Sequence, residues 1–302
     1  MPRWFLFTVL AVLCWGLWAI ISRLIGEAVT AAQSQALSTL GLIPVMIALG
    51  CSKRLTASGS RRRGICNAFI AGALACAGNV AYYHALNVGG KASTVVPLTA
   101  LYPLITVVLA VAVLRERLNA IQLCGIVLSL VAIWLFNVAS VEGVMNQWLV
   151  YALIPVGLWG VSGLLQKIST NDISGELSAF WFLAAFIPVG VVILLLQPLT
   201  GPLATKTWTL VVALGLFFSL GNFALLLAFA REGKASIIAP LAGLYPVVSV
   251  PIAITALGEK ISLREGLGIA VALASVAALA WEGSGAMGTP RPTISTKHET
   301  HH

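Results

Sequence analysis

Long runs of apolar residues alternate with short polar segments along the whole chain. Ten of these runs are close to the length of about 20 residues that an α-helix needs to cross the hydrocarbon core of a membrane. The predicted spans are residues 5–25, 31–49, 65–86, 93–114 and 121–138, then residues 148–168, 177–196, 208–230, 236–257 and 263–281. We therefore expect an all-α integral membrane protein with ten transmembrane helices joined by short connections.

One segment of the chain occurs twice, at an offset of 143 residues. Residues 90–103 read GKASTVVPLTALYP, and residues 233–246 read GKASIIAPLAGLYP. When the alignment is extended to residues 78–118 and 221–261, 17 of the 41 aligned positions are identical. Apolar composition alone does not produce such similarity, so the chain contains an internal duplication.

The duplication divides the chain into two homologous halves of five helices each. A Trp-Gly dipeptide, at residues 15–16 and 159–160, marks the first helix of each half. We expect the first half at residues 1–142 and the second at residues 143–282. The polar segment at residues 283–302 is predicted to be a disordered cytoplasmic tail.

An odd number of helices per half means that the second half enters the membrane upside down relative to the first. Lys91 falls in a loop on the outer side, whereas its repeat partner Lys234 falls on the inner side. Inverted repeats are common in secondary transporters, because exchanging the conformations of the two halves turns an inward opening into an outward one. The topology therefore indicates alternating access.

The composition and the distribution of charge agree with a membrane protein. Apolar residues make up 59% of the chain and charged residues 9%, against about 45–50% and 25% in average soluble domains. With the N-terminus placed in the cytoplasm, 13 of the 18 Lys and Arg residues fall on the cytoplasmic side, as the positive-inside rule requires. We therefore expect a multi-pass protein of the bacterial cytoplasmic (inner) membrane with both termini in the cytoplasm. The net charge of +8 is explained by topology and not by a nucleic-acid partner.

Prolines occupy matching positions in the fourth and ninth predicted spans, as Pro97 and Pro103 in one and Pro240 and Pro246 in the other. A proline removes a backbone donor and kinks the helix. In a membrane the freed carbonyl groups need partners in the protein or in a wet cavity. The matched kinks fit a bend that shapes a central cavity or gate, and they also fit a static curvature that serves packing.

Aromatic residues near the middle of the spans form two repeat-related pairs, Trp15 with Trp159 and Tyr102 with Tyr245. Tryptophan and tyrosine normally concentrate at the membrane interfaces, so their position at mid-depth needs an explanation. The pattern indicates an uncharged, aromatic-lined cavity that suits a small amphipathic or aromatic solute, or a cation on the ring faces. The alternative is packing by large side chains that form hydrogen bonds across helices.

Further residues complete the predicted substrate site. Asn79 and Asn222 form another repeat-related pair and supply amide groups inside the third and eighth spans. Aromatic candidates nearer the interfaces are Trp18, Tyr82, Tyr83 and Trp181. No Asp or Glu falls in the middle of a predicted span, so His84 is the remaining candidate for an intramembrane proton site. This favours a facilitator over a proton-coupled carrier.

The sequence offers weak signatures for catalysis or metal binding, and we expect neither, nor a cofactor. The five cysteines have no CxxC spacing, and the HETHH sequence at residues 298–302 matches a zinc-protease motif only in a flexible tail. The sequence GVSG around Ser162 resembles the serine motif of intramembrane rhomboid proteases, but the one histidine within a span, His84, precedes it. An intramembrane hydrolase that uses Ser162 is therefore a distant alternative.

These features together resemble a known family. The chain resembles the drug/metabolite transporter superfamily with paired EamA-type domains. The resemblance rests on two five-helix halves, on the Trp-Gly dipeptide in the first helix of each half, on GKAS followed by P-L-x-x-L-Y-P, and on L-x-E at the end of each fourth helix. Residues 5–282 are most similar to bacterial exporters of aromatic amino acids, the YddG type. The resemblance implies an inner-membrane exporter with a central cavity between its halves.

The resulting expectation is export of neutral, aromatic amino acids and related small metabolites by alternating access. A multidrug or lipophilic-cation exporter of the same superfamily is the alternative. A structural membrane protein without transport would leave the inverted duplication without a use. We expect a small-molecule substrate and the lipid bilayer as partners, and we favour a monomer, although Gly125 and Gly268 permit close packing within or between subunits.

Overall fold

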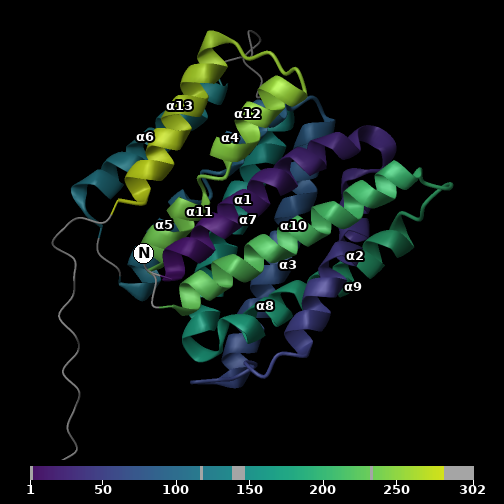
Figure 1. Ribbon diagram of the computed structural model, residues 1–302. Helices are drawn as coiled ribbons and strands as arrows, with labels where there is room; N and C mark the ends of the chain where they lie inside the picture. Colours follow the sequence, from purple (N-terminus) through teal and green to yellow (C-terminus); the bar gives the residue numbers. More distant parts are fainter. Residues whose placement is uncertain (1–2, 116–117, 138–146, 232–233, 282–302) are drawn as a thin grey trace, which may run out of the picture.

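The structure is a computed structural model that describes residues 3–115, 118–137, 147–231 and 234–281 (Figure 1). The helices of the first half are α1 (Arg3–Ile25), η1 (Gly26–Ala28), α2 (Ala31–Gly50), α3 (Arg61–Asn87), α4 (Ala92–Thr99), α5 (Pro103–Leu114) and α6 (Ala120–Asn137). Those of the second half are α7 (Gln147–Asp172), α8 (Gly175–Ala184), α9 (Phe186–Leu196), α10 (Thr205–Ala230), α11 (Ala235–Ala242), α12 (Pro246–Ala256) and α13 (Leu263–Leu279). The predicted tail at residues 283–302 lies outside the described residues.

Helices occupy all ten predicted spans, which confirms the all-helical fold. Within the described residues, eight of these spans are long and apolar enough to cross a membrane, and the other two are the shorter helices α6 and α13. Among the described residues, β-pairing is limited to one bridge between Ala57 and Ile173. The chain is therefore a multi-pass membrane protein.

The helix α3 begins four residues earlier than the apolar pattern predicts. Its first turn contains Arg61, Arg62 and Arg63, and the hydroxyl of Ser60 accepts a hydrogen bond from the N–H of Arg63 at 3.4 Å. Serine at this position satisfies one of the free N–H groups at the start of a helix. The arginines are thus part of the helix end, where hydrophobicity gives no signal.

Three spans that we predicted as continuous helices are interrupted, and proline explains each interruption. In each case a proline lies four residues after the last residue of the preceding helix. The prolines are Pro103 after α4, Pro188 after α8 and Pro246 after α11. A proline has no N–H to bond to the carbonyl four residues earlier, so the regular helix ends there. The other two predicted kink positions, Pro97 and Pro240, lie inside α4 and α11, and these short helices continue through them.

Two tyrosines connect the interrupted spans of opposite halves. The hydroxyl of Tyr102 donates to the carbonyl of Ala239 in α11 at 3.3 Å. The hydroxyl of Tyr245 donates to the carbonyl of Val96 in α4 at 3.5 Å and lies 3.2 Å from the Thr99 hydroxyl. Val96 and Ala239 are themselves repeat partners, 143 positions apart. The two contacts are therefore reciprocal, and each adds a side-chain hydrogen bond to a backbone carbonyl beside a break that already accepts one from a backbone N–H.

Equivalent contacts at opposite ends of the bundle confirm that the halves are inverted. Arg23 donates to the Leu86 carbonyl at 3.3 Å near the end of α3, and the corresponding Lys167 donates to the Phe229 carbonyl at 3.2 Å. Ser169, which follows Lys167, donates to the carbonyl of Gly64 near the start of α3. Because α3 has 27 residues and spans roughly 40 Å, the two contacts lie on opposite faces.

The shorter helices α6 and α13, one from each half, lie side by side at one edge of the bundle (Figure 1). The hydroxyls of Ser129 and Ser275 are 2.6 Å apart between them. A Cβ on Gly125 would lie 2.9 Å from Leu279, and one on Gly268 would lie 3.0 Å from the ring of Phe136. These glycines therefore allow close packing within the chain.

Candidate functional site

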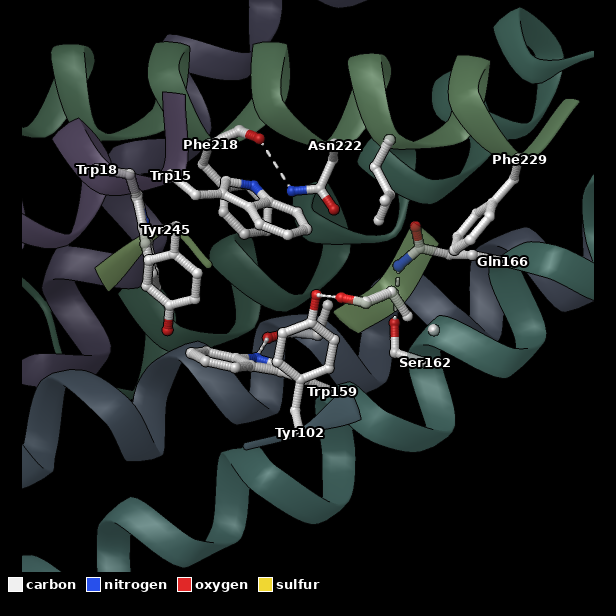
Figure 2. Close-up of a pocket in the computed structure, with 14 residues that line it drawn as sticks. Trp15, Trp18, Tyr102, Trp159, Ser162, Gln166, Phe218, Asn222, Phe229 and Tyr245 are labelled. Carbon is white, nitrogen blue, oxygen red and sulfur yellow. Dashed lines mark hydrogen bonds between the residues drawn. The ribbon is translucent and has the colours of Figure 1, made fainter. Parts of the chain in front are cut away.

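A cavity lies between the two halves, beside the interrupted spans (Figure 2). Its lining residues are Trp15, Trp18, Ala75, Tyr102, Trp159, Ser162, Gly163, Gln166, Phe218, Asn222, Leu225, Phe229, Ala239 and Tyr245. The space open to the centre of a water-sized sphere is about 50 Å³, and one water needs roughly 10–15 Å³ by this measure. The site in this conformation has room for a few water molecules, so a larger solute requires it to widen.

The four aromatic residues predicted at mid-depth all line this cavity. Trp15 makes edge-to-face contacts with Tyr102 and Tyr245, with ring centroids 6.5 and 6.2 Å apart. Tyr102 makes the same type of contact with Trp159 at 6.2 Å. Aromatic pairs prefer such geometry because the positive ring edge meets the negative ring face. The rings thus form one connected wall built from both halves.

Glycines of the repeat motifs hold the two tryptophans in place. A Cβ on Gly78 of α3 would collide with the indole of Trp159, and a Cβ on Gly221 of α10 would lie 2.5 Å from the indole of Trp15. In each case the glycine belongs to one half and the tryptophan to the other. The repeat-related glycines Gly78 and Gly221, each followed by one of the predicted asparagines, therefore mark where helices of opposite halves meet.

The indole N–H groups of the two tryptophans differ in their partners. Trp159 Nε1 donates to the carbonyl of Ala75 at 3.4 Å. Trp15 Nε1 is buried and has no hydrogen-bond partner among the described residues. The corresponding carbonyl, that of Phe218, accepts a hydrogen bond at 2.9 Å from the side-chain amide of Asn222. The Trp15 N–H is thus a free donor in the wall of the cavity.

A chain of hydrogen bonds on α7 positions a second polar group. The hydroxyl of Ser162 donates to the carbonyl of Ala71 at 2.9 Å, and Gln166 Nε2 donates to the Ser162 oxygen at 3.2 Å. Gln166 is 5% exposed, and its Oε1 has no partner among the described residues. A buried acceptor without a partner costs about 1–3 kcal/mol. Such a group is a candidate for substrate binding.

The two predicted asparagines occupy different surroundings. Asn222 lines the cavity and is 3% exposed; Figure 2 shows its side-chain oxygen turned toward the cavity while its nitrogen bonds to the Phe218 carbonyl. Asn79 is also buried, but it is not part of the cavity lining, and its Oδ1 has no partner among the described residues. The sequence repeat alone does not distinguish these two positions.

Trp18 lies at one end of the cavity and backs onto two of the predicted tyrosines. Its ring stacks on Tyr82 with centroids 4.9 Å apart, and its Nε1 donates to the hydroxyl of Tyr83 at 3.0 Å. Ser22 donates to the hydroxyl of Tyr82 at 3.4 Å. Tyr82 and Tyr83 are buried behind Trp18 and do not line the cavity. They support the wall without forming part of it.

Two other candidates lie away from the cavity. Trp181 of α8 is half-buried and makes an edge-to-face contact with Phe180. His84, near the end of α3, packs its ring against Tyr151 of α7 with centroids 4.2 Å apart. Neither residue is part of the lining. The proposed proton site at His84 therefore has no direct contact with this cavity.

The cavity is displaced toward one face of the bundle because the two halves differ in side-chain size. By the repeat alignment, Trp18 and Tyr82 correspond to Ser162 and Leu225. The first pair fills its space with stacked rings, whereas the second pair lines open space. In Figure 2, Trp18 lies at one end and Gln166 lies with Phe229 at the other, toward the face where α7 and α10 end.

Charged contacts hold the opposite face closed. The carboxylate of Glu259 accepts hydrogen bonds from the N–H groups of Ala92 and Ser93 at 2.9 and 2.7 Å, at the start of α4. Arg23 Nε lies 3.6 Å from the same carboxylate. Negative charge at a helix N-terminus is favourable because the free N–H groups carry partial positive charge. Beside it, Lys91 forms an ion pair with Glu265 at 2.8 Å.

The lining residues are uncharged, which bears on the chemistry of the site. The lining contains no Asp, Glu, Lys, Arg or His, and the described residues contain no group of three or more potential metal ligands. Ser162 donates its proton to the Ala71 carbonyl, and no lining residue is a base that could activate it. The arrangement provides aromatic surface, an unpartnered indole N–H donor and amide oxygen acceptors, which suits reversible binding.

The search for polar and aromatic residues near the middle of the spans missed several residues of the cavity lining. Helical periodicity would have identified them. On α7, Ser162, Gly163 and Gln166 follow Trp159 at intervals that keep them on one face. On α10, Phe218, Leu225 and Phe229 share a face with Asn222 in the same way. Ala75 and Ala239 give no sequence signal, because small apolar residues occur throughout the spans.

Comparisons with known proteins agree with this architecture. The EamA-like transporter family matches the chain twice, over residues 2–138 and 146–281. A solved crystal structure has a TM-score of 0.64 and 18% sequence identity, and the similarity covers 90% of this chain and 97% of that one. At this identity the likeness shows the fold alone.

The chain is also similar to an uncharacterized protein of Methanocaldococcus jannaschii, with 41% identity over 73 residues. This match covers 24% of the present chain. The chain spans about half the length (53%) of that curated relative.

Proposed function

Since the chain belongs to the EamA-like transporter family, a family of membrane transporters, we propose that it carries neutral amino acids, with a preference for aromatic side chains. The observation that supports this most is the cavity between the halves, which is lined by aromatic rings and uncharged polar groups. Rings bury the aromatic part of such a substrate, and the free donor and acceptor groups pair with its polar end. This specificity corresponds to that of YddG-type exporters.

We further propose that transport runs outward across a bacterial cytoplasmic membrane by alternating access. The positive-inside distribution of Lys and Arg supports an orientation with the N-terminus, and the end of the cavity at Gln166 and Phe229, toward the cytoplasm. The face closed by Arg23 and Glu259 then lies outside. Because the lining contains no Asp, Glu, Lys, Arg or His, we propose that substrate moves down its own gradient. The proposed transport unit is the monomer.

The experiment that tests this proposal measures uptake into proteoliposomes of the purified protein. The labelled solutes are tryptophan, phenylalanine, threonine and a lipophilic cation, each with and without a proton gradient. We expect uptake of tryptophan and phenylalanine that exceeds uptake of threonine and needs no gradient. Uptake of the cation alone, or strict dependence on the gradient, would replace this proposal with a drug antiporter.

A further inference from the structure

We propose that Gln166 and Asn222 form an amine-recognition site that binds the protonated amino group of the substrate at one end of the cavity. The inference rests on the proposed function, since it assigns the end of the cavity at which the amino group lies. It defines the substrate class as primary amines that carry an aromatic or apolar group. It also predicts that the amino group contributes more to binding than the carboxylate does.

The orientation of the Gln166 amide is fixed by its neighbours. Ser162 uses its proton in the hydrogen bond to the Ala71 carbonyl, so toward Gln166 it can only accept. Gln166 must then present its NH₂ group to Ser162, at 3.2 Å, and its oxygen away from it. The oxygen is buried and without a partner among the described residues. This amide is therefore held as an acceptor at a lining position.

The orientation of the Asn222 amide is fixed in the same way. Its Nδ2 donates to the Phe218 carbonyl at 2.9 Å, which can only accept. The amide oxygen then faces the cavity (Figure 2). Two helices, α7 and α10, thus each present a carbonyl-type oxygen on an amide whose orientation is fixed by one hydrogen bond from its NH₂ group. An ammonium group donates three hydrogen bonds and accepts none, so it matches such a pair.

The rest of the lining gives a substrate carboxylate little to bind. Among the described lining residues, Trp15 Nε1 is the one side-chain N–H donor atom without any hydrogen-bond partner, and there is no Lys or Arg. The N–H groups at the start of α5 and α12 already bond within the breaks, as those of Ile105 and Val248 do to Tyr102 and Tyr245. The cavity therefore favours a cationic end over an anionic end, with the aromatic group against the rings nearer Trp18.

The test measures binding to the detergent-solubilised full-length chain through quenching of its tryptophan fluorescence. The probes are phenethylamine, L-phenylalanine and 3-phenylpropanoate, which share one ring and differ in their polar groups. We expect the two amines to bind at least about tenfold more tightly than 3-phenylpropanoate, because a hydrogen bond to a charged group is among the stronger ones. Equal or tighter binding of 3-phenylpropanoate, or no binding of any probe, would overturn the inference.

Variants test the residues themselves. Gln166→Met keeps the length of the side chain and removes the acceptor, so we expect at least about tenfold weaker binding of both amines and unchanged binding of 3-phenylpropanoate. The matched control is Gln35→Met, because Gln35 is a buried glutamine of α2 whose Oε1 also lacks a partner among the described residues, but it does not line the cavity. Equal effects of the two variants on amine binding would overturn the inference.

The two proposals fail in different ways. If phenylalanine is not transported but phenethylamine binds and depends on Gln166, the amino-acid function is wrong and the amine site stands. If phenylalanine is transported equally well by Gln166→Met and Gln35→Met, the amine site is wrong and the function stands.

Discussion

At the scale of single residues, the site depends on polar atoms that the fold leaves without partners. The two repeat-related tryptophans have the same type of packing against glycine, yet only the Trp159 N–H has a hydrogen-bond partner, the Ala75 carbonyl. The Trp15 N–H remains free because Asn222 bonds to the Phe218 carbonyl. The N–H group of Trp159 therefore contributes to stability, whereas the N–H group of Trp15 is left without a hydrogen-bond partner among the described residues.

This difference predicts opposite outcomes for the same substitution. Trp159→Phe removes a hydrogen bond that contributes roughly 0.5–1.5 kcal/mol, so its melting temperature falls below that of Trp15→Phe. Trp15→Phe removes a ligand contact of similar strength, so its KM for phenylalanine rises about two- to tenfold. Thermal unfolding in detergent and initial transport rates measure both. An unchanged KM for Trp15→Phe would show that its N–H does not bind substrate.

The sequence predicts these residues unevenly. Tryptophan and tyrosine at mid-depth are conspicuous, because they normally lie at the interfaces, and Trp15, Trp159, Tyr102 and Tyr245 all line the cavity. Gln166 requires a helical projection of α7, since it lies two turns beyond Trp159. The different surroundings of Asn79 and Asn222 follow from three-dimensional packing, which an alignment of the two halves does not contain.

At the scale of elements, the two repeat-related interrupted spans are central to the account. Their breaks follow from Pro103 and Pro246, and the tyrosine beside each break bonds to the short helix of the other half. The sequence predicts that these spans bend, and it does not show that they divide into separate helices. The third break, before Pro188, lies outside the duplicated segment and was not predicted.

Replacing the proline at either break with alanine restores a backbone N–H group, and we expect this to slow transport. Pro103→Ala and Pro246→Ala each allow a bond to the carbonyl four residues earlier, which favours one continuous helix over two. We expect transport rates to fall several-fold with no loss of thermal stability. The control is Pro44→Ala in α2, because that helix continues through its proline and does not line the cavity. Equal rates for all three variants would mean that the breaks serve packing.

At the scale of the whole molecule, the inverted halves give the protein two faces with related contacts. On one face Glu259 binds the start of α4 and pairs with Arg23. Its repeat partner, Glu116, lies outside the described residues. The duplication predicts this inverted arrangement from the sequence alone, because five helices per half leave no other topology. It does not predict which face is closed, since that depends on the packing of Trp18 and Tyr82 against Ser162 and Leu225.

The central claim is that substrate crosses through the cavity between the halves, so the closed face must open in every cycle. We would introduce cysteines at Arg23 and Glu259 in a background without native cysteines and join them with a short, reducible crosslinker. Single-cysteine variants treated with the reagent serve as controls. Phenylalanine transport in proteoliposomes should stop on crosslinking and return on reduction. Full transport by the crosslinked protein would contradict the account, because substrate would then cross without opening this face.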